Sequence, residues 1–239
     1  MKTYLWLLSM LIGFASVSTA WAATEFGVVD ELEGGAYILD KTGKQLPIQL
    51  GQVIVTGQTI HTAAHSELHI TSSDGGLIAL RPDSIFQVDE YIATHSADDK
   101  IILRLIKGSM RSVTGWVPRH HPESYKVETS VASIGIRGTD HEVHILEHGH
   151  EEAGVHNRVH SGGTVLRNAL GEVHINAGEF AQAPHDVATP PILLKQKPKF
   201  HDSILLKIEH KFEQRRDELL HLLDEIRDAW LKRFGNSTS

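Results

Sequence analysis

A strand-like alternation of side chains runs through the middle of the chain and is interrupted once. Apolar or β-branched residues occupy every second position over residues 127–131 and again over residues 143–145. A period of two residues is typical of half-buried β-strands. The segment between them, residues 136–140, is therefore predicted to be a tight corner that joins two strands.

The corner contains the sequence Arg137-Gly138-Thr139-Asp140. Gly138 would supply the backbone freedom that a sharp change of direction needs. Thr139 and Asp140 can form hydrogen bonds with the backbone of the turn itself. These four residues are predicted to be a structural signature with no chemistry of its own.

Short strand-like segments continue on both sides of the corner. From Glu25 to Ala183 they are separated by Gly, Asp and Ser turns, and helical periodicity is nearly missing. This pattern predicts a mainly β domain over residues 23–183, with its core over residues 51–148. The expected architecture is a β-sandwich or a short irregular β-solenoid.

Six segments in a fixed order resemble the FecR domain, over roughly Gly27–Ala183. They are Leu50–Thr62, Ser66–Leu80, Arg81–Phe86, Ile101–Arg111, the corner Arg137–Asp140, and Gly163–Glu179. The resemblance implies an extracytoplasmic all-β module, known best from regulators that relay signals from outer-membrane receptors. In those regulators a cytoplasmic anti-sigma segment and a membrane helix precede the FecR domain. Here the FecR-like region follows the N-terminal segment directly, so a recognition module is expected rather than a direct anti-sigma role.

Residues 1–22 have the features of a secretory signal peptide. Lys2 gives the positive start, Leu5–Phe14 the apolar run, and Ala20-Trp-Ala22 the small-residue cleavage motif. Cleavage would leave Ala23 as the first residue of a periplasmic or secreted protein. An uncleaved membrane anchor is the alternative, because the apolar region is long enough to span a bilayer.

The composition narrows the possible partners. The chain has no cysteine, which excludes disulfides and cysteine-based zinc sites. Its formal net charge is −7 at pH 7, and its Lys and Arg residues are scattered rather than gathered. No nucleic-acid partner is therefore expected.

The C-terminal part differs in kind from the β-domain. Prolines punctuate residues 184–199, which predicts a Pro-rich linker. Residues 200–235 are predicted to form one amphipathic helix, because apolar residues recur there at spacings of three and four. This stripe consists of Leu205, Ile208, Phe212, Leu219, Leu222, Ile226 and Trp230.

Such a stripe needs a cover. The helix is expected to pack back across the β-domain or to pair with itself as a coiled coil. Binding of an external partner is the other possibility. The helix carries mixed rather than purely basic charge, which argues against binding to a membrane surface.

Histidine is unusually frequent, with 17 residues in the chain. Six fall within one short region: His141, His144, His148, His150, His156 and His160. Imidazole binds divalent transition metals and titrates near neutral pH, so a metal site is one hypothesis. The favoured interpretation is a solvated His-rich loop around His148 and His150. No cofactor beyond such a metal is expected.

No pattern in the chain indicates catalysis. Asp140 and His141 are adjacent on a predicted strand, so their side chains would point to opposite faces. Ser161-Gly-Gly163 lacks a nucleophile-elbow pattern. We expect a non-enzymatic module that binds a protein or envelope partner in signalling or regulation. A His-rich metal or small-ligand sensor and a structural oligomer built through the helix are the alternatives.

Overall fold

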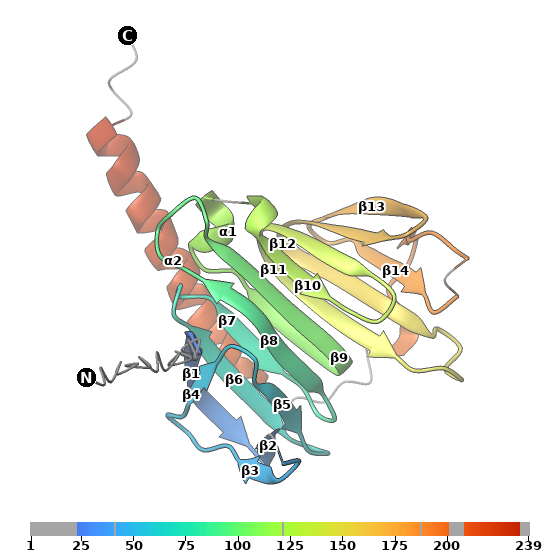
Figure 1. Ribbon diagram of the computed structural model, residues 1–239. Helices are drawn as coiled ribbons and strands as arrows, with labels where there is room; N and C mark the ends of the chain where they lie inside the picture. Colours follow the sequence, from blue (N-terminus) through green and yellow to red (C-terminus); the bar gives the residue numbers. More distant parts are fainter. Residues whose placement is uncertain (1–22, 41, 121, 187, 201–207, 235–239) are drawn as a thin grey trace, which may run out of the picture.

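The computed structural model describes residues 23–40, 42–120, 122–186, 188–200 and 208–234 (Figure 1). Over these ranges the chain forms one continuous 15-stranded sheet and a long C-terminal helix. The mainly β prediction with a C-terminal helix is confirmed. The predicted signal peptide, residues 1–22, lies outside the described residues.

The sheet folds into two layers, so its architecture is the sandwich of the two that were predicted. The first layer runs in the order β4 (Val53–Val55), β1 (Glu25–Glu33), β6 (Glu67–Ser72), β7 (Leu77–Leu80), β9 (Lys100–Val113), β11 (Ser133–Leu146), β12 (Gly154–Asn168), β14 (Phe180–Pro184) and β15 (Ile192–Leu194). The second layer runs in the order β3 (Gln45–Pro47), β2 (Ala36–Leu39), β5 (Thr59–Thr62), β8 (Ile85–Ile92), β9, β10 (Tyr125–Glu128), β11, β12 and β13 (Gly171–Asn176).

Three long strands belong to both layers because each one bends. The first part of β11 pairs with β10 and its second part with β9. The first part of β12 pairs with β14 and its second part with β13. Likewise β9 pairs with β10 through its first half and with β7 and β11 through its second.

The prediction that residues 136–140 form a tight corner between two strands is wrong. These residues lie inside the single strand β11, where the pairing with β12 shifts register between Arg137 and Asp140. Gly138 adopts a positive φ of 59°, so the backbone freedom expected of it is used, but in a β-bulge. A bulge bends and twists the strand without reversing it. The reversal comes earlier, at residues 129–132, where the Thr129 amide donates to the Ala132 carbonyl at 2.9 Å.

The apolar core lies between the two layers. Inward side chains alternate along each strand with outward ones, as the two-residue period requires. Phe26 packs edge-on against Tyr91, with ring centroids 5.1 Å apart. Other fully buried members are Leu68, Ile70, Leu80, Phe86, Leu103, Leu105, Met110, Ile134, Val143 and Leu166.

Two short turns connect the parallel pair β9 and β10. They are the helix α1 (Val117–His120) and the 3₁₀ turn η1 (Pro122–Ser124). A parallel pair requires such a crossover because a hairpin cannot join it. The other strand pairs of the described residues are antiparallel.

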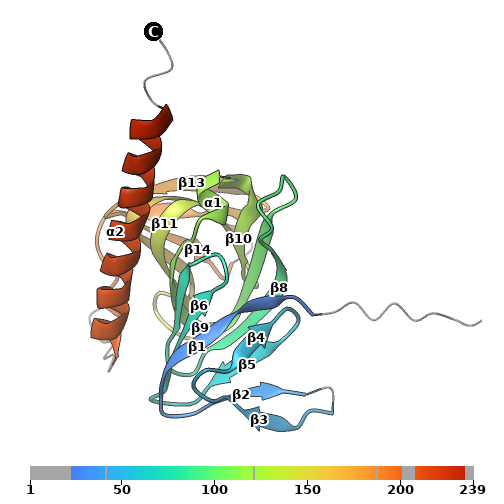
Figure 2. The ribbon, with the colours of Figure 1, turned by 90° about the vertical axis from the view of Figure 1, so that its left-hand side faces the viewer.

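The helix α2 (Glu209–Phe234) lies on the outer face of the first layer (Figure 2). Its C-terminal part extends beyond the sheet (Figure 1). The predicted linker at residues 184–199 also contributes β15, which pairs with β14 at the edge of the sheet. An edge position suits a segment that is flanked by prolines. Among the described helices, none is long and apolar enough to cross a membrane.

Candidate functional site

The contact between α2 and the first layer brings together some of the residues that the sequence singled out, among them Asp140, Ile208 and Phe212. Its apolar part is small. Phe212 is 1% exposed and packs with Leu77, Ala79 and Val113 of the sheet, and the partly buried Leu219 joins them. Because so few apolar side chains meet there, polar contacts account for much of the interface.

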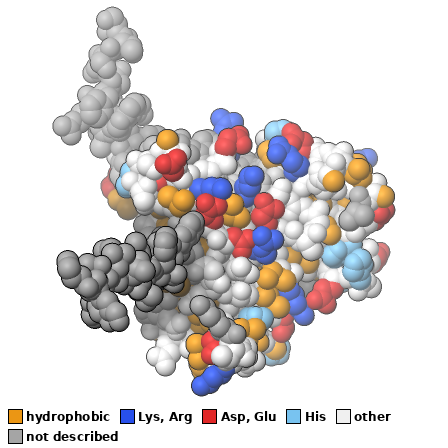
Figure 3. Space-filling view, viewed as in Figure 1, with side chains coloured by type: hydrophobic (Ala, Val, Ile, Leu, Met, Phe, Trp, Pro, Cys, Tyr) orange, Lys and Arg blue, Asp and Glu red, His pale blue; other side chains and the backbone are white. Residues whose placement is uncertain are grey.

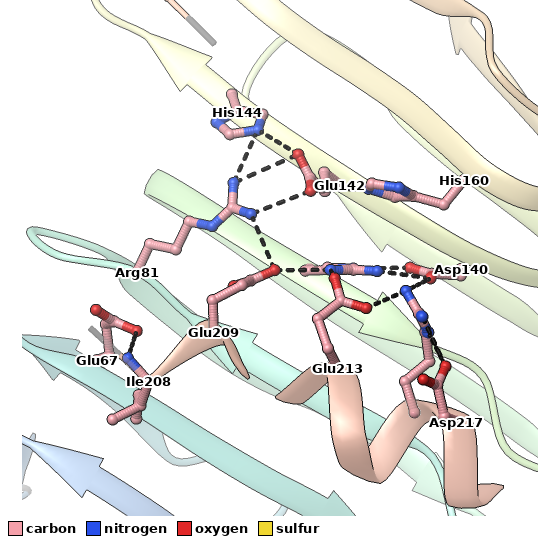
Figure 4. Close-up of polar contacts among 12 residues, drawn as sticks. Glu67, Arg81, Asp140, Glu142, His144, His160, Ile208, Glu209, Glu213 and Asp217 are labelled. Carbon is pink, nitrogen blue, oxygen red and sulfur yellow. Dashed lines mark hydrogen bonds and ion pairs between the residues drawn. The ribbon is translucent and has the colours of Figure 1, made fainter. Parts of the chain in front are cut away.

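Arg111 is the centre of these polar contacts, and its partners Asp140, Glu209 and Glu213 are labelled in Figure 4. Its guanidinium is 1% exposed and donates to both carboxylate oxygens of Asp140, at 2.9 and 2.8 Å. The remaining nitrogen donates to Glu209 at 2.6 Å and also to Glu213, both on α2. The guanidinium carbon lies 5.0 Å from the centre of the Phe212 ring. Burial opposes the charge of Arg111, but its bonds to Asp140 and Glu213 hold its pKa above the ordinary value.

A second buried cation, Arg81, lies one strand position beyond β7. Its guanidinium is 3.1 Å from Glu142 and 3.1 Å from the His144 ring. Glu142 also contacts His144 at 3.2 Å and His160 at 2.8 Å. Burial alone would raise the pKa of Glu142, but hydrogen bonds from the two histidines and the charge of Arg81 hold it well below its usual range. Glu142 is therefore a carboxylate at neutral pH.

Arg81 also links this cluster to the helix, because Glu209 lies 4.0 Å from it. Glu209 thus contacts both buried arginines. We call Arg81, Arg111, Asp140, Glu142 and Glu209 the polar seam. Asp140 and Glu142 lie two residues apart on β11 and so face the same side, toward α2.

Further ion pairs flank the seam along the helix. Lys211 contacts Glu31 at 2.7 Å, and Arg215 contacts Asp30. At the start of the helix, the Ile208 amide donates to the Glu67 carboxylate at 3.2 Å. Such a carboxylate satisfies one free amide and favours the positive end of the helix dipole.

The four signature residues have separate roles. Asp140 is the buried partner of Arg111, and Gly138 makes the bulge. The hydroxyl of Thr139 donates to the Gly163 carbonyl at 2.8 Å, and its amide donates to Thr114 at 2.9 Å. Thr139 and Asp140 therefore bind distant strands instead of the turn backbone that the sequence suggested. Arg137 is exposed and has no polar partner among the described residues.

The six histidines do not form one cluster. His144 and His160 belong to the surroundings of Glu142. His141 is fully buried, and burial lowers its pKa to about 4. His156 is also buried, with a lowered pKa for the same reason, and its Nε2 lies 2.7 Å from the Glu152 carbonyl.

The other two histidines lie in the β11–β12 turn, as the sequence predicted. His148 stacks on His185, with ring centroids 4.2 Å apart. His150 accepts a hydrogen bond from the Glu152 amide at 3.0 Å. Over the described part of the chain, no group of three or more His, Asp or Glu side chains is arranged to hold a metal ion.

The predicted helix stripe is only partly covered. Ile208 and Phe212 are buried against the sheet, and Leu219 is partly buried. Leu222 is 51% exposed. Leu205, and the side chains of Ile226 and Trp230, lie outside the described residues. The helix packs back across the β-domain, which was one of the expected arrangements.

Sequence reasoning missed the two arginines and their helix partners. Arg81 directly follows the apolar strand segment Leu77–Leu80, and an isolated Arg in such a position is a signal for a buried ion pair. Arg111 follows Ser109 and Met110 within β9 and has no such signal. Glu209, Phe212 and Glu213 share one side of α2 because they are three or four residues apart. Their partners on the sheet could not be read from that spacing.

Residues 58–163 match the family model described as FecR protein. These residues of the chain are a FecR domain. The matched region includes Arg81, Arg111, Asp140, Glu142 and the two histidines that contact Glu142. Helix α2 lies outside it. In this FecR-domain protein the polar seam therefore joins the family domain to a separate C-terminal element.

Solved structures give a weaker likeness. Two crystal structures of a candidate anti-sigma factor from Parabacteroides distasonis ATCC 8503, at 2.50 and 1.65 Å resolution, each align with a TM-score of 0.46. Their identities to this FecR-domain protein are 13% and 14%. Each alignment covers 58% of this chain and 60% of the other. A search of curated proteins found no match.

Proposed function

We propose that this FecR-domain protein is a non-enzymatic module of the bacterial cell envelope that binds a protein or envelope partner in signalling or regulation. The family match supports a recognition role, since residues 58–163 form the FecR domain. The signal-like residues 1–22 support export to the periplasm. Residues 23–239 would then be the working protein.

The observation that carries the proposal is the way α2 is held. The polar seam and Phe212 fix its first turns on the FecR domain. With 26 residues, the helix is about 39 Å long. After Leu219 and Leu220, the described side chains of His221, Leu222, Asp224 and Glu225 are exposed. A helix that is fixed at one end and exposed at the other is a surface that a partner can bind.

The partner could itself be a second copy of the chain. Leu222 is exposed on a helix whose earlier apolar residues are already covered by the sheet. Light scattering of residues 23–239 separates the two cases. A monomer favours a different protein or envelope component, whereas a dimer that is lost on Leu222→Asp favours the structural oligomer.

Capture from envelope extract tests the proposal. Residues 23–239 would be immobilised beside a variant that lacks residues 222–239 and a matched variant that lacks only residues 235–239. We expect the full module and the matched variant to retain the same envelope component, and the shorter variant to lose it. Retention of nothing specific by any of the three, after cross-linking at physiological ionic strength, would refute the proposed function.

Export has its own test. Mass spectrometry of the periplasmic fraction should find a protein that begins at Ala23. Intact chains that begin at Met1 and stay in the inner membrane would show that the segment is an uncleaved anchor.

A further inference from the structure

A cleft of about 350 Å³ lies on the outer face of the second layer, over β10, β11, β12 and β13. This is the side of the sandwich opposite α2 (Figures 1 and 2). Figure 3 shows the face on which it opens, where Lys and Arg side chains lie among Asp and Glu side chains. The volume falls in the range of small-molecule and peptide sites.

The floor of the cleft is made largely of small residues. Gly135 of β11 and Gly163 of β12 both line it. A Cβ at Gly135 would meet its nearest neighbour only at 4.0 Å, and one at Gly163 at 3.6 Å. The space above the two glycines is therefore open, because glycine has no side chain to fill it. A ligand could approach the backbone there.

Lys126 and His174 frame this floor, as the strand register shows. Lys126 pairs with Gly135, which pairs with Val165, which pairs with His174. Three strand spacings therefore separate Lys126 from His174, about 14 Å. Both residues line the cleft, one at each side of the floor.

Two arginines close the other two sides. Arg167 pairs with Ser133, which is four residues before Arg137 on β11. At about 3.3 Å per residue, the two guanidinium-bearing positions are about 13 Å apart along the strands. Arg167 contacts Glu172 at 2.6 Å, whereas Arg137 and Lys126 have no polar partner among the described residues. Glu123 is the acidic residue that lines the cleft.

Arg137 is the one signature residue that the packing of the sandwich does not explain. Gly138, Thr139 and Asp140 make the bulge, the bond to Gly163 and the ion pair with Arg111. Arg137 is instead exposed and lines the cleft. A frame of about 13 by 14 Å matches an extended peptide of about four residues, and side chains on alternate residues would place carboxylates about 7 Å apart. Arg and Lys at such positions bind carboxylates by charge-assisted hydrogen bonds.

We propose that the cleft framed by Lys126, Arg137, Arg167 and His174 binds a short acidic segment of a protein partner. The inference rests on the proposed function and names the chemistry of the partner at a second surface, away from α2. Charge complementarity selects a peptide with carboxylates on alternate residues. The small-residue floor allows its backbone to lie close to the sheet.

Fluorescence anisotropy with residues 23–239 tests the proposal. The probe is a capped, labelled pentapeptide that alternates Glu and Ala, and the matched probe replaces each Glu with Gln. We expect the Glu peptide to bind, to weaken as salt rises, and to outbind the Gln peptide by at least about tenfold. The double variant Arg137→Gln and Arg167→Gln should weaken the Glu peptide by about tenfold or more.

Arg104→Gln is the matched control. Arg104 is an exposed arginine of the second layer that pairs with Asp89 and does not line the cleft, so its replacement removes one positive charge from this layer and none from the cleft. The affinity of the Arg104→Gln variant for the Glu peptide should stay within about twofold of the affinity of the unmodified protein. Equal binding of the two peptides, or equal binding by the double variant and the unmodified protein, overturns the proposal.

Two further measurements distinguish peptide binding from general anion binding, and test the cleft separately from the proposed function. Full competition by millimolar inorganic phosphate, or by vesicles that contain an anionic lipid, would show a general anion site and overturn the peptide proposal. An envelope partner retained equally by the unmodified protein and by the double variant leaves the proposed function standing and refutes the cleft as its site. Specific peptide binding without any captured partner supports the cleft and counts against the proposed function.

Discussion

Replacement of Arg111 by Met should destabilise the whole module strongly. Arg111 and Asp140 are almost completely buried, at 1% and 3% side-chain exposure. The Met side chain keeps the packing volume beneath Phe212 but leaves the Asp140 carboxylate without its bidentate partner. Breaking a buried pair by removing one member costs about 3–5 kcal/mol.

That loss is large for a protein of this size. Domains are stable by about 5–15 kcal/mol, and each 1 kcal/mol shifts Tm by about 2–4 °C for chains of 150–250 residues. A decrease in Tm of about 10 °C is therefore expected. Thermal melting followed by far-ultraviolet circular dichroism, with urea unfolding at 25 °C, measures it.

Two further variants give the result its meaning. Arg104→Met removes an exposed arginine from its pair with Asp89 and should cost about 1 kcal/mol or less. Arg111→Met combined with Asp140→Leu removes both buried charges and should recover much of the loss. If Arg111→Met melts like Arg104→Met, the account of Arg111 as the centre of the interface is wrong.

Three other predictions concern the bulge at Gly138, the docking of α2 and two buried histidines. Gly138→Val should lower the free energy of unfolding by about 1–3 kcal/mol, because a β-branched residue does not readily adopt the φ of 59° found at Gly138. Gly135→Ala should change the urea midpoint little, and equal midpoints for the two variants would show that Gly138 occupies an ordinary strand position. Leu219→Asp should lower Tm without changing the mass found by light scattering, because Leu219 packs against the sheet, whereas Leu222→Asp should leave Tm unchanged; the reverse order would contradict this docking of α2. Burial lowers the pKa of His69 and His141 to about 4, whereas histidine in the unfolded chain has a pKa of about 6.5. Below pH 6.5 the unfolded chain therefore binds more protons than the folded protein, and the free energy of unfolding should fall from pH 6.5 toward pH 4. Urea unfolding at pH 7.5, 5.5 and 4.5 measures that loss, which His69→Phe should reduce; a flat profile would contradict it.

The β-domain could be predicted because its signal is local. Alternation within each strand and the Gly, Asp and Ser turns between strands survive in any arrangement of the sheet. The bulge at Gly138 could not be told from a turn. Both place a positive-φ glycine between two alternating segments, and only the pairing partners of β11 distinguish them.

The polar seam depends on contacts that are distant in the sequence. Arg111 meets Asp140 from 29 positions away and Glu209 from 98 positions away. The first contact follows from the register of β9 with β11, and the second from the packing of α2 on the first layer. The apolar stripe of α2 predicted that the helix needs a cover. It could not select the sheet, because the same stripe would serve a second copy or a partner.

The histidines show the same limit. Their number and spacing suggested a metal site or a solvated loop. Two of the six lie in the turn, but His144 and His160 contact Glu142, and His141 is fully buried. Which imidazole meets which carboxylate depends on the pairing of β11 with β12, which composition does not contain.

Site-specific photo-cross-linking in cells tests whether the exposed part of α2 binds an envelope partner. A photoreactive amino acid would replace Leu222, on the exposed part of α2, and in a matched strain Lys44, on the exposed β2–β3 turn. We expect one adduct of defined mass in the envelope fraction from position 222 and none from position 44. The absence of any adduct at position 222, with the protein folded and exported, would contradict a binding role for this FecR-domain protein.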